Sequence, residues 1–307
     1  MEGDDPWSAA MRRGDFAAAW AVSDAVLRAR ASAGETCHHW PRHLQYVWRG
    51  APIDGRRLLV RCYHGLGDTI QFVRFAPQLR ARAAAVVLWA QPALCSLVAR
   101  IAGVDRVLPL HDGSPDAPYD VDIEIMEAPH VLGTHLRSLP RTIPYVFPRP
   151  AEPVVPAAGR LRVGLAWRSG DWDARRSLPR AALAPLLAIP GIDFLSLQRC
   201  GTGTATPPAG ASDFSAPDIE TLAARLSTLD LVITVDGMIA HLAGALGVRT
   251  WVLLHAACDW RWMTARDDSP WYPTMRLFRQ RNPGDWDYPV ARAAESLVQE
   301  QSSLTPH

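Results

Sequence analysis

The sequence contains no lysine, so all 32 of its lysine-plus-arginine positions are arginines. Mechanisms that need a lysine amine are therefore excluded, among them the Walker A phosphate loop and the pyridoxal Schiff base. The chain also lacks an excess of charge, because 31 acidic residues leave a formal net charge of +1. Nucleic-acid binding normally needs a broad positive field, so we expect no nucleic-acid partner.

Cysteines are few, and long apolar runs are missing. The five cysteines are far apart and odd in number, which predicts reduced thiols rather than a disulfide framework. No apolar run reaches membrane-spanning length, and the N-terminus has no basic stretch followed by an apolar one. We therefore expect a cytoplasmic protein. A composition of 48% hydrophobic and 21% charged residues is typical of a chain that buries substantial cores.

The first 50 residues differ from the rest of the chain in composition and in the spacing of their apolar residues. Residues 7–30 are rich in alanine, and their larger apolar residues are spaced as helix faces on both sides of a Gly14-Asp15 break. This pattern predicts a helical hairpin. It is similar to one tetratricopeptide unit, but no second copy follows, so we predict a short helical extension over residues 1–50 rather than a repeat array.

Strand and helix patterns alternate through the remaining chain. We assign residues 51–150 to a first Rossmann-like domain and 151–307 to a second one, with a boundary in the proline-rich stretch 148–159. Such alternation is typical of parallel strands covered by helices. The predicted fold class is therefore α/β, with two Rossmann-like halves preceded by a helical hairpin.

A glycine turn, His64-Gly65-Leu66-Gly67-Asp68, follows the first strand and opens a helix. Glycine lets the backbone approach a ligand, and the amides of a helix start attract anions. Asp68 has two interpretations. It is either the N-cap of the helix, with Gln71 completing a capping pair, or a general base for an acceptor hydroxyl.

A second turn follows the very apolar stretch 231–235 and contains Asp236, Gly237, Met238, Ile239 and His241. Gly237 permits close approach, and the next amides are unpaired helix-start donors, so a diphosphate would fit here. In the alternative interpretation, Asp236 is a helix cap and His241 is a buried helix residue bonded to the backbone.

A third candidate is the stretch 167–177, which leaves the first strand of the second half. In a chain without lysine, Arg168, Arg175 and Arg176 are the candidates to neutralise a phosphate leaving group, because a guanidinium fork pairs with two phosphate oxygens. The alternative is a solvated charged loop.

Three further patterns are interpreted structurally. We expect the tryptophan-rich stretches 259–262 and 268–273 to pack against their own domain. The acid-X-acid triplets at 120–122, 171–173 and 285–287 are interpreted as surface or capping acids. Cys37, His38, His39 and His43 are not expected to bind zinc, because adjacent ligands point apart and a proline interrupts the helix, so we expect no metal.

Several ordered motifs resemble a known family. The stretches 48–60 and 65–72 resemble the start of the glycosyltransferase domain of bacterial tetratricopeptide-linked proteins. That domain is similar to the family 9 glycosyltransferases, which include the ADP-heptose:lipopolysaccharide heptosyltransferases. The stretches 196–198 and 235–247 resemble the donor-site segment, and 259–280 with 284–286 extends the match, which covers about residues 48–300.

The resemblance implies a GT-B architecture, with two Rossmann-like domains facing across a cleft. It also implies inverting, metal-independent transfer from a nucleotide-diphosphate sugar to a glycan, lipopolysaccharide or protein acceptor, with no cofactor. Asp68 falls where the heptosyltransferases place their catalytic base. The implied acceptor side contains His64, Gly65 and Gly67, and the implied donor side contains Arg168, Arg176, Gln198, Asp236, Gly237, Met238, Ile239 and His241.

Two positions depart from the family pattern. Tyr63-His64 stands where the tetratricopeptide-linked relatives have Glu-Gln, and the loop after residue 167 lacks a Gly-Asn-Pro pattern. A non-catalytic module that binds a nucleotide sugar or a protein partner is the main alternative, and a phosphorylase or epimerase is a weaker one. The resemblance leaves room for peripheral membrane association through a lipid-linked acceptor and for a protein partner on the N-terminal helices.

Overall fold

The computed structural model describes residues 5–33, 48–149, 160–170, 172–200, 203–204 and 206–304, and the chain forms two compact units. Unit 1 comprises Met1–Phe147 together with Asp259–Ala265, and unit 2 comprises Pro148–Cys258 together with Arg266–His307. The cysteine and histidine group at 37–43 lies outside the described residues. Within the described ranges, no helix has both the length and the apolar character needed to cross a membrane.

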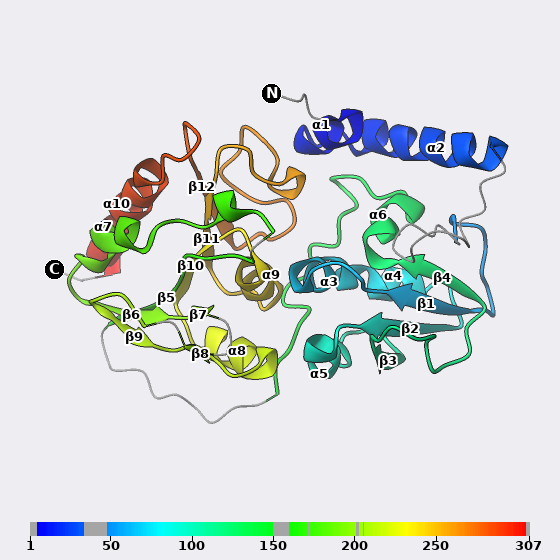
Figure 1. Ribbon diagram of the computed structural model, residues 1–307, viewed down its shortest axis with the longest axis horizontal. Coiled ribbons are helices and arrows are strands. Elements are labelled where there is room, and N and C mark those ends of the chain that lie inside the picture. The colour runs from blue at the N-terminus through cyan, green and yellow to red at the C-terminus, as the bar shows by residue number, and fades with distance from the viewer. Residues whose placement is uncertain are drawn as a thin grey trace. The chain divides into compact units, whose positions relative to one another are not determined.

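Unit 1 is built on a parallel four-stranded sheet of order β3-β2-β1-β4 (Figure 1). Its elements are α1 (Pro6–Arg12), α2 (Phe16–Ser32), β1 (Arg57–Arg61), α3 (Leu66–Phe72), η3 (Val73–Phe75), α4 (Ala76–Arg80), β2 (Ala85–Ala90), η4 (Pro92–Leu94), α5 (Cys95–Val98), β3 (Arg106–Pro109), β4 (Val121–Glu124), η5 (Ile125–Glu127), α6 (Ala128–Val131) and η8 (Trp260–Trp262). Strand β1 is buried from Leu58 onward, which fits a central parallel strand covered on both faces.

Strand β4 was not predicted, because two of its four residues are acidic and such residues are depleted in strands. Asp122 of this strand is 2% exposed and forms an ion pair with Arg61 of β1. A buried carboxylate is tolerated when an opposite charge pairs with it. The interpretation of Asp122 as a surface or capping acid is therefore wrong. Asp120, by contrast, forms an exposed ion pair with Arg57.

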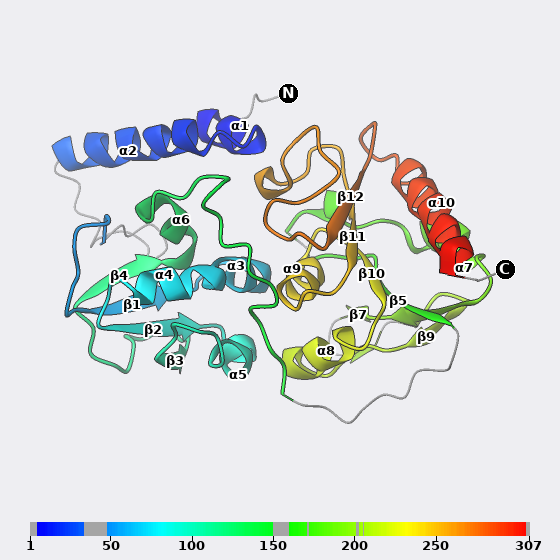
Figure 2. The same cartoon turned by 180° about the vertical axis from the view of Figure 1, so that it is seen from behind.

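The N-terminal hairpin has its break where the sequence indicates it. Gly14 has a φ of 75°, and the carboxylate of Asp15 accepts a hydrogen bond from the amide of Ala18 at 3.0 Å, so it caps α2. Trp7 of α1 lies against Trp20 of α2, with ring centroids 6.3 Å apart. Helix α2 continues past α6, as both views of the ribbon show (Figures 1 and 2).

The segment Asp259–Ala265 packs with unit 1, although the strands before and after it belong to unit 2. The Trp260 ring lies 5.2 Å from that of Trp7 and 6.4 Å from that of Phe72. The expectation that this tryptophan-rich stretch packs against the second domain is wrong for these residues, because α1 and α3 supply the apolar surface that covers Trp260.

Unit 2 contains a parallel six-stranded sheet of order β12-β11-β10-β5-β6-β9 and an antiparallel pair, β7 and β8. Its elements are β5 (Leu161–Ala166), η6 (Ala174–Arg176), η7 (Arg180–Leu183), α7 (Ala184–Leu187), β6 (Ile192–Ser196), β7 (Arg199–Cys200), β8 (Gly203–Thr204), β9 (Ala211–Asp213), α8 (Ile219–Leu226), β10 (Leu231–Val235), α9 (Met238–Ala245), β11 (Thr250–Leu254), β12 (Met275–Arg279) and α10 (Asp287–Leu304). The predicted α/β class with parallel sheets is confirmed.

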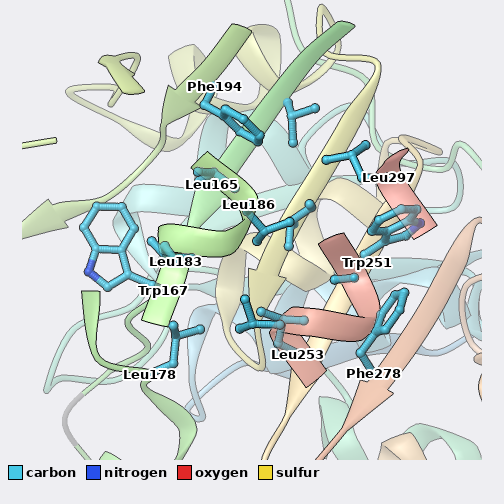
Figure 3. Close-up of a cluster of buried hydrophobic side chains, with 14 of the residues drawn as sticks. Leu165, Trp167, Leu178, Leu183, Leu186, Phe194, Trp251, Leu253, Phe278 and Leu297 are labelled. Atoms are coloured by element: carbon cyan, nitrogen blue, oxygen red, sulfur yellow. The ribbon is translucent and has the colours of Figure 1, made fainter. Parts of the chain in front are cut away.

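The main core of unit 2 lies between one face of this sheet and the pair α7 and α10, which lie side by side (Figures 2 and 3). Leu165, Leu253 and Phe278 point from the strands into this cluster, where they meet Leu186 of α7 and Leu297 of α10. Helices α8 and α9 contribute nothing to the cluster and cover the other face. Both faces of the sheet are thus covered by helices and buried from water, so the polar groups lie at the ends of the strands.

Candidate active site

The strand order of unit 1 reverses beside β1. The chain runs from β1 through β2 to β3 on one side and then returns to β4 on the other side. Since the strands are parallel, the segments that leave β1 and β4 meet at the same edge. Ligands of open α/β sheets bind at such a reversal, outside the carboxyl ends of the strands. Here those segments contain His64 and Asp68 after β1, and Glu124 at the end of β4.

Asp68 lies in the first turn of α3 and is not its N-cap, although its side chain forms the N3 part of a capping box. The N-cap is Gly65, whose amide donates a hydrogen bond to Asp68 Oδ2 at 2.9 Å. A Cβ on Gly65 would come within 3.1 Å of that oxygen, so glycine suits this position. The interpretation of Asp68 as an N-cap is therefore wrong. Its supposed capping partner, Gln71, is fully buried.

The second oxygen of Asp68 is held by an arginine from the far end of the chain. Arg261 Nη2 donates to Asp68 Oδ1 at 2.7 Å, and the Arg261 side chain also lies 3.3 Å from the Asp259 carboxylate. An ionised carboxylate has about four lone-pair sites, so each Asp68 oxygen can still accept another hydrogen bond. The Asp68 side chain remains 20% exposed, which leaves it accessible to a ligand.

Sequence reasoning missed Arg261, because 193 positions separate it from Asp68. The only signal was its place within a tryptophan-rich stretch, and that pattern predicts packing rather than a site.

Glu124 is a second carboxyl group at this edge and is only 3% exposed. Its Oε1 lies 3.7 Å from His64 Nε2, and its Oε2 accepts a hydrogen bond from the Met126 amide at 2.7 Å. Burial, with smaller contributions from the Glu127 and Asp68 carboxylates, raises the pKa of Glu124 to about 8. The group is therefore mostly protonated at neutral pH. It was missed because β4 was not predicted.

Gln91, which follows β2, fixes the loop that contains His64. Its Nε2 donates to the His64 carbonyl at 2.6 Å, and its Oε1 accepts from Thr69 Oγ1 at 3.0 Å. Within this loop His64 and Gly65 are exposed, and Gly67 is half-buried. The predicted acceptor-side residues thus lie with Asp68 in the loop after β1 and the first turn of α3.

Unit 2 has a reversal of its own, between the neighbouring strands β5 and β10. The chain continues from β5 to β6 and β9 on one side, and from β10 to β11 and β12 on the other. The loops that follow β5 and β10 are in contact, because a Cβ on Gly237 would come 2.8 Å from Ser169 Oγ. Gly237 is the N-cap of α9, so the interpretation of Asp236 as the cap is wrong. Asp236 is 3% exposed.

The start of α9 contains two more predicted donor-side residues. Met238 and Ile239 are half-buried in the first turn, where backbone amides have no acceptor within the helix and the dipole favours an anion. His241 lies one turn further and is buried. Its burial fits the alternative interpretation, and its Nδ1 lies 3.0 Å from the Tyr272 hydroxyl.

Gln198 ties the ends of β5 and β6 together. Its Oε1 accepts hydrogen bonds from the amides of Trp167, at 3.2 Å, and Arg168, at 2.9 Å. Its Nε2 donates to the Arg199 carbonyl at 3.0 Å. Gln198 therefore fixes the backbone of the loop, while the Arg168 side chain is exposed.

The other arginines of this loop differ in their surroundings. Arg176 is buried, donates to the Gly170 carbonyl at 3.3 Å and lies 4.3 Å from the centre of the Trp172 ring. Arg175 is exposed and pairs with Asp173 at 2.9 Å.

His255, immediately after β11, was missed by sequence reasoning. It is 5% exposed. The hydrogen bond from Arg175 lowers the pKa of Asp173, and His255 makes a smaller contribution in the same direction, so His255 lies near this loop. Its place directly after a buried strand was the signal that could have identified it.

In the part of the chain that the structure describes, no three histidine, cysteine or acidic side chains gather as a metal site would require. Two of the acidic triplets contain local capping residues, as predicted. Asp173 accepts a hydrogen bond from the Arg175 amide at 3.0 Å, and Asp285 accepts one from the Tyr288 amide at 3.2 Å. Cys62, Cys95 and Cys258 are not joined in disulfides, and Arg279 donates a hydrogen bond to Cys258 Sγ at 3.0 Å.

No family model matches the sequence. Protein FlbA of Caulobacter vibrioides is 26% identical to the chain over 294 residues, which cover 81% of this chain and 48% of FlbA. The chain thus spans about half the length of this curated relative.

Solved structures of glycosyltransferases are similar to the chain in fold. TibC from enterotoxigenic Escherichia coli, described as an iron-containing dodecameric glycosyltransferase, has a TM-score of 0.55 at 14% identity, covering 82% of this chain and 78% of TibC. The E. coli ADP-heptose lipopolysaccharide heptosyltransferase II has a TM-score of 0.52 at 14% identity, covering 80% of this chain and 99% of that one.

A family 9 glycosyltransferase from Veillonella parvula has a TM-score of 0.52 at 12% identity, with coverage of 82% of this chain and 98% of that one. These likenesses establish the fold. The chain has the GT-B fold of glycosyltransferases, with two Rossmann-like units.

Proposed function

We propose that the chain is an inverting glycosyltransferase that moves a sugar from a nucleotide-diphosphate sugar to an acceptor hydroxyl. The observation that carries this proposal is the difference between the two strand-order reversals. One presents an accessible, fixed carboxylate, and the other presents helix-start amides next to arginines. General-base chemistry needs the first, and a departing diphosphate needs the second. A structure of TibC contains ADP-D-beta-D-heptose, which is a donor of the proposed class.

Asp68 is the proposed base. The acceptor oxygen would attack the anomeric carbon opposite the departing diphosphate, and its proton would pass to an Asp68 oxygen, so the configuration inverts. Hydrogen bonds from Arg261 and Gly65 fix both carboxylate oxygens and leave each one a lone pair for the hydroxyl. His64, Gly65 and Gly67 would provide the backbone and side-chain surface around the acceptor.

The donor diphosphate is proposed to bind at the start of α9. The amides that follow Gly237, in Met238 and Ile239, would donate to phosphate oxygens. Arg168 would reach the same oxygens from the loop that touches Gly237, since Ser169 is the residue in contact. Arg176 and Gln198 would hold that loop, as their hydrogen bonds to Gly170 and Arg168 suggest. The buried Asp236 and His241 would support α9 from within unit 2.

We also propose that no metal takes part, because arginine and helix-start amides would neutralise the leaving group. EDTA-treated protein should therefore transfer sugar at the rate of untreated protein, and a loss restored by one metal would contradict this part of the proposal. The acceptor class stays open among a glycan, lipopolysaccharide and a protein. A lipid-linked acceptor would bring the enzyme to a membrane surface, and α1 and α2 would provide a surface for a protein acceptor.

A non-catalytic binding module is the second candidate, and one observation favours it. Asp68 already has a charged partner in Arg261, an arrangement that would also serve a purely structural ion pair. In that case the chain would bind a nucleotide sugar without turning it over.

A ligand screen followed by a turnover assay separates the two candidates. Thermal unfolding with ADP, UDP, GDP and their sugar conjugates should identify one nucleotide that raises Tm, because a ligand of the native state stabilises by mass action. The matching nucleotide sugar should then release nucleotide diphosphate slowly to water and faster with an acceptor. Binding without any release would favour the module, and no binding across the panel would reject both candidates.

A further inference from the structure

A cavity of about 430 Å³ lies in unit 1 between α2, the end of β4 and α6. Its size is within the range of small-molecule sites. The wall contains aromatic, acidic and basic side chains, and the argument below uses Trp20, Asp24, Trp48, Glu124, Glu127 and His130. Helix α2, which runs past α6 (Figure 1), contributes residues to one side of the cavity. None of these residues except Glu124 has a part in the site described above.

Two carboxyl groups line this cavity, the buried Glu124 and the half-buried Glu127. Glu124 Oε1 is buried and accepts no hydrogen bond from any residue that the structure describes. Buried polar atoms nearly always have a partner, so an unpartnered carboxyl oxygen in a cavity wall indicates a place for a hydrogen-bonding group of a ligand. Burial raises the pKa of Glu127 as well, so both groups favour a ligand that offers hydrogen bonds without adding negative charge.

Two tryptophans supply the apolar part of the wall. The Trp20 indole N–H donates to the Thr134 carbonyl at 2.6 Å, and the Trp48 indole N–H donates to the Ala51 carbonyl at 2.8 Å. Because both polar tips are engaged by the backbone, the rings are fixed and offer carbon surface to the cavity. Sugar rings present carbon-bound hydrogens on their faces and hydroxyls at their rims, which matches this mixture of surfaces.

The charges around the cavity nearly balance. Asp24 pairs with His130 at 2.8 Å, and two arginines, Arg28 and Arg49, offset the acidic residues of the wall. A strongly charged ligand would lack a matching excess, whereas a neutral ligand with several hydroxyls could use both carboxyl oxygens and guanidinium groups.

Glu124 connects this cavity to the loop of the proposed base. The same Oε1 that lacks a hydrogen bond lies 3.7 Å from His64 Nε2, and His64 precedes Asp68 by four positions. We propose that the cavity binds a sugar ring of the acceptor, packed on Trp20 and Trp48 with hydroxyls on Glu124 and Glu127. The ligand class follows from the cavity, and its role as acceptor rests on the proposed function.

A large side chain introduced at an exposed position of the cavity wall tests this proposal. Ala31 lines it from α2 and is exposed, so Ala31→Trp should fill the space and leave folding intact. Ala25→Trp on the same helix is the matched control, because Ala25 is exposed and does not line the cavity. Saturation-transfer NMR without nucleotide would use methyl α-D-mannopyranoside, methyl α-L-rhamnopyranoside and N-acetylglucosamine as probes, each at millimolar concentration.

We expect at least one probe to bind wild type and Ala25→Trp equally, and to bind Ala31→Trp about tenfold more weakly. Glu124→Gln, which preserves the shape of the side chain, should also weaken binding. No binding of any probe, or equal binding by Ala31→Trp and wild type, would overturn the inference. Donor turnover is measured separately. If Ala31→Trp transfers sugar as fast as wild type, the cavity is not the acceptor site, and the proposed glycosyl transfer still stands. If the probes bind but wild type never turns over a donor, the cavity binds sugars and the proposed transfer is rejected.

Discussion

Unit 1 and unit 2 share the strand order around the reversal of their parallel sheets but differ in the groups placed there. In unit 1 the segments after β1 and β4 carry Asp68 and Glu124, both carboxyl groups. In unit 2 the loops after β5 and β10 carry arginines and the amide-rich start of α9. Topology therefore decides where a ligand site can form, and the side chains at that edge decide which chemistry it performs.

The two edges are also held in different ways. Asp68 is held by Arg261, a side chain from a remote segment of the chain. The unit 2 loops are held locally, because Ser169 touches Gly237 and the Gln198 amide ties two strand ends together. Unit 1 thus depends on a contact across the sequence, whereas unit 2 depends on close backbone packing.

The largest expected effect is the loss of the proposed base. Asp68→Asn should lower the transfer rate by roughly 10²–10⁴-fold, the usual contribution of a general base, because an amide cannot take the proton. Nucleotide affinity, measured by calorimetry, should stay near the wild-type value, since the donor groups are assigned to unit 2. Asp112→Asn, an exposed acid of unit 1, is the control. Full activity of Asp68→Asn would remove the assigned base.

Crowding the start of α9 should affect the donor instead. In Gly237→Ala the new Cβ would lie 2.8 Å from Ser169 Oγ, so this hydroxyl must turn away or the loop must shift. We expect nucleotide affinity about tenfold lower by calorimetry. The double variant Ser169→Ala with Gly237→Ala removes the clashing oxygen and leaves Cβ contacts of 3.5 Å, so it should recover most of the affinity. Unchanged affinity in the single variant would contradict the donor assignment.

Substitution of Arg261 should show whether this residue positions Asp68 or binds the donor. Arg261→Ala frees Asp68 Oδ1, so kcat should fall about tenfold while the KM for the donor stays constant. Arg261→Lys keeps one charged donor and should recover part of kcat. If both variants raise KM for the donor as much as they lower kcat, Arg261 acts on donor binding and not through Asp68.

The smallest effect is on stability and depends on pH. The pKa of Glu124 is raised from 4.5 to about 8 in the folded chain. Below pH 4.5 the carboxyl group of Glu124 is protonated in both the folded and the unfolded chain. As the pH rises from 4.5 to about 8, only the unfolded chain releases this proton, so the free energy of unfolding falls over that range. Glu124→Gln cannot titrate. We therefore compare the Tm of Glu124→Gln with that of wild type by scanning calorimetry. The difference, variant minus wild type, should be roughly 5 °C larger at pH 8 than at pH 5. A constant difference would show that Glu124 is ionised when folded.

Several features of the site could be predicted from local patterns. The glycine turn before Asp68 and the apolar strand before Gly237 are local signals, and the structure places both residues at helix starts as those signals indicate. The exact capping roles could not be predicted, because neighbouring residues compete for the N-cap through small differences in backbone geometry. His241 could be predicted as buried, but its partner Tyr272 is 31 positions away and no local pattern indicates it.

The residues that were missed share a physical reason. Glu124 and Asp122 are acidic residues in a short strand, which propensity disfavours and which tertiary ion pairing and burial permit. Arg261 reaches Asp68 only because its segment packs on α1 and α3 of unit 1. Strand β12 was also missed, because two of its five residues are arginines.

The amino-acid sequence by itself determined the α/β class, the two sheets and the turns that leave their strands, because hydrophobic periodicity and glycine placement act over short distances. Tertiary structure alone decided which of those turns meet, which carboxyl groups lose water, and which arginine holds Asp68. Those outcomes depend on contacts between residues far apart in the chain, and burial changes a charged group's energy only after the surrounding elements have packed.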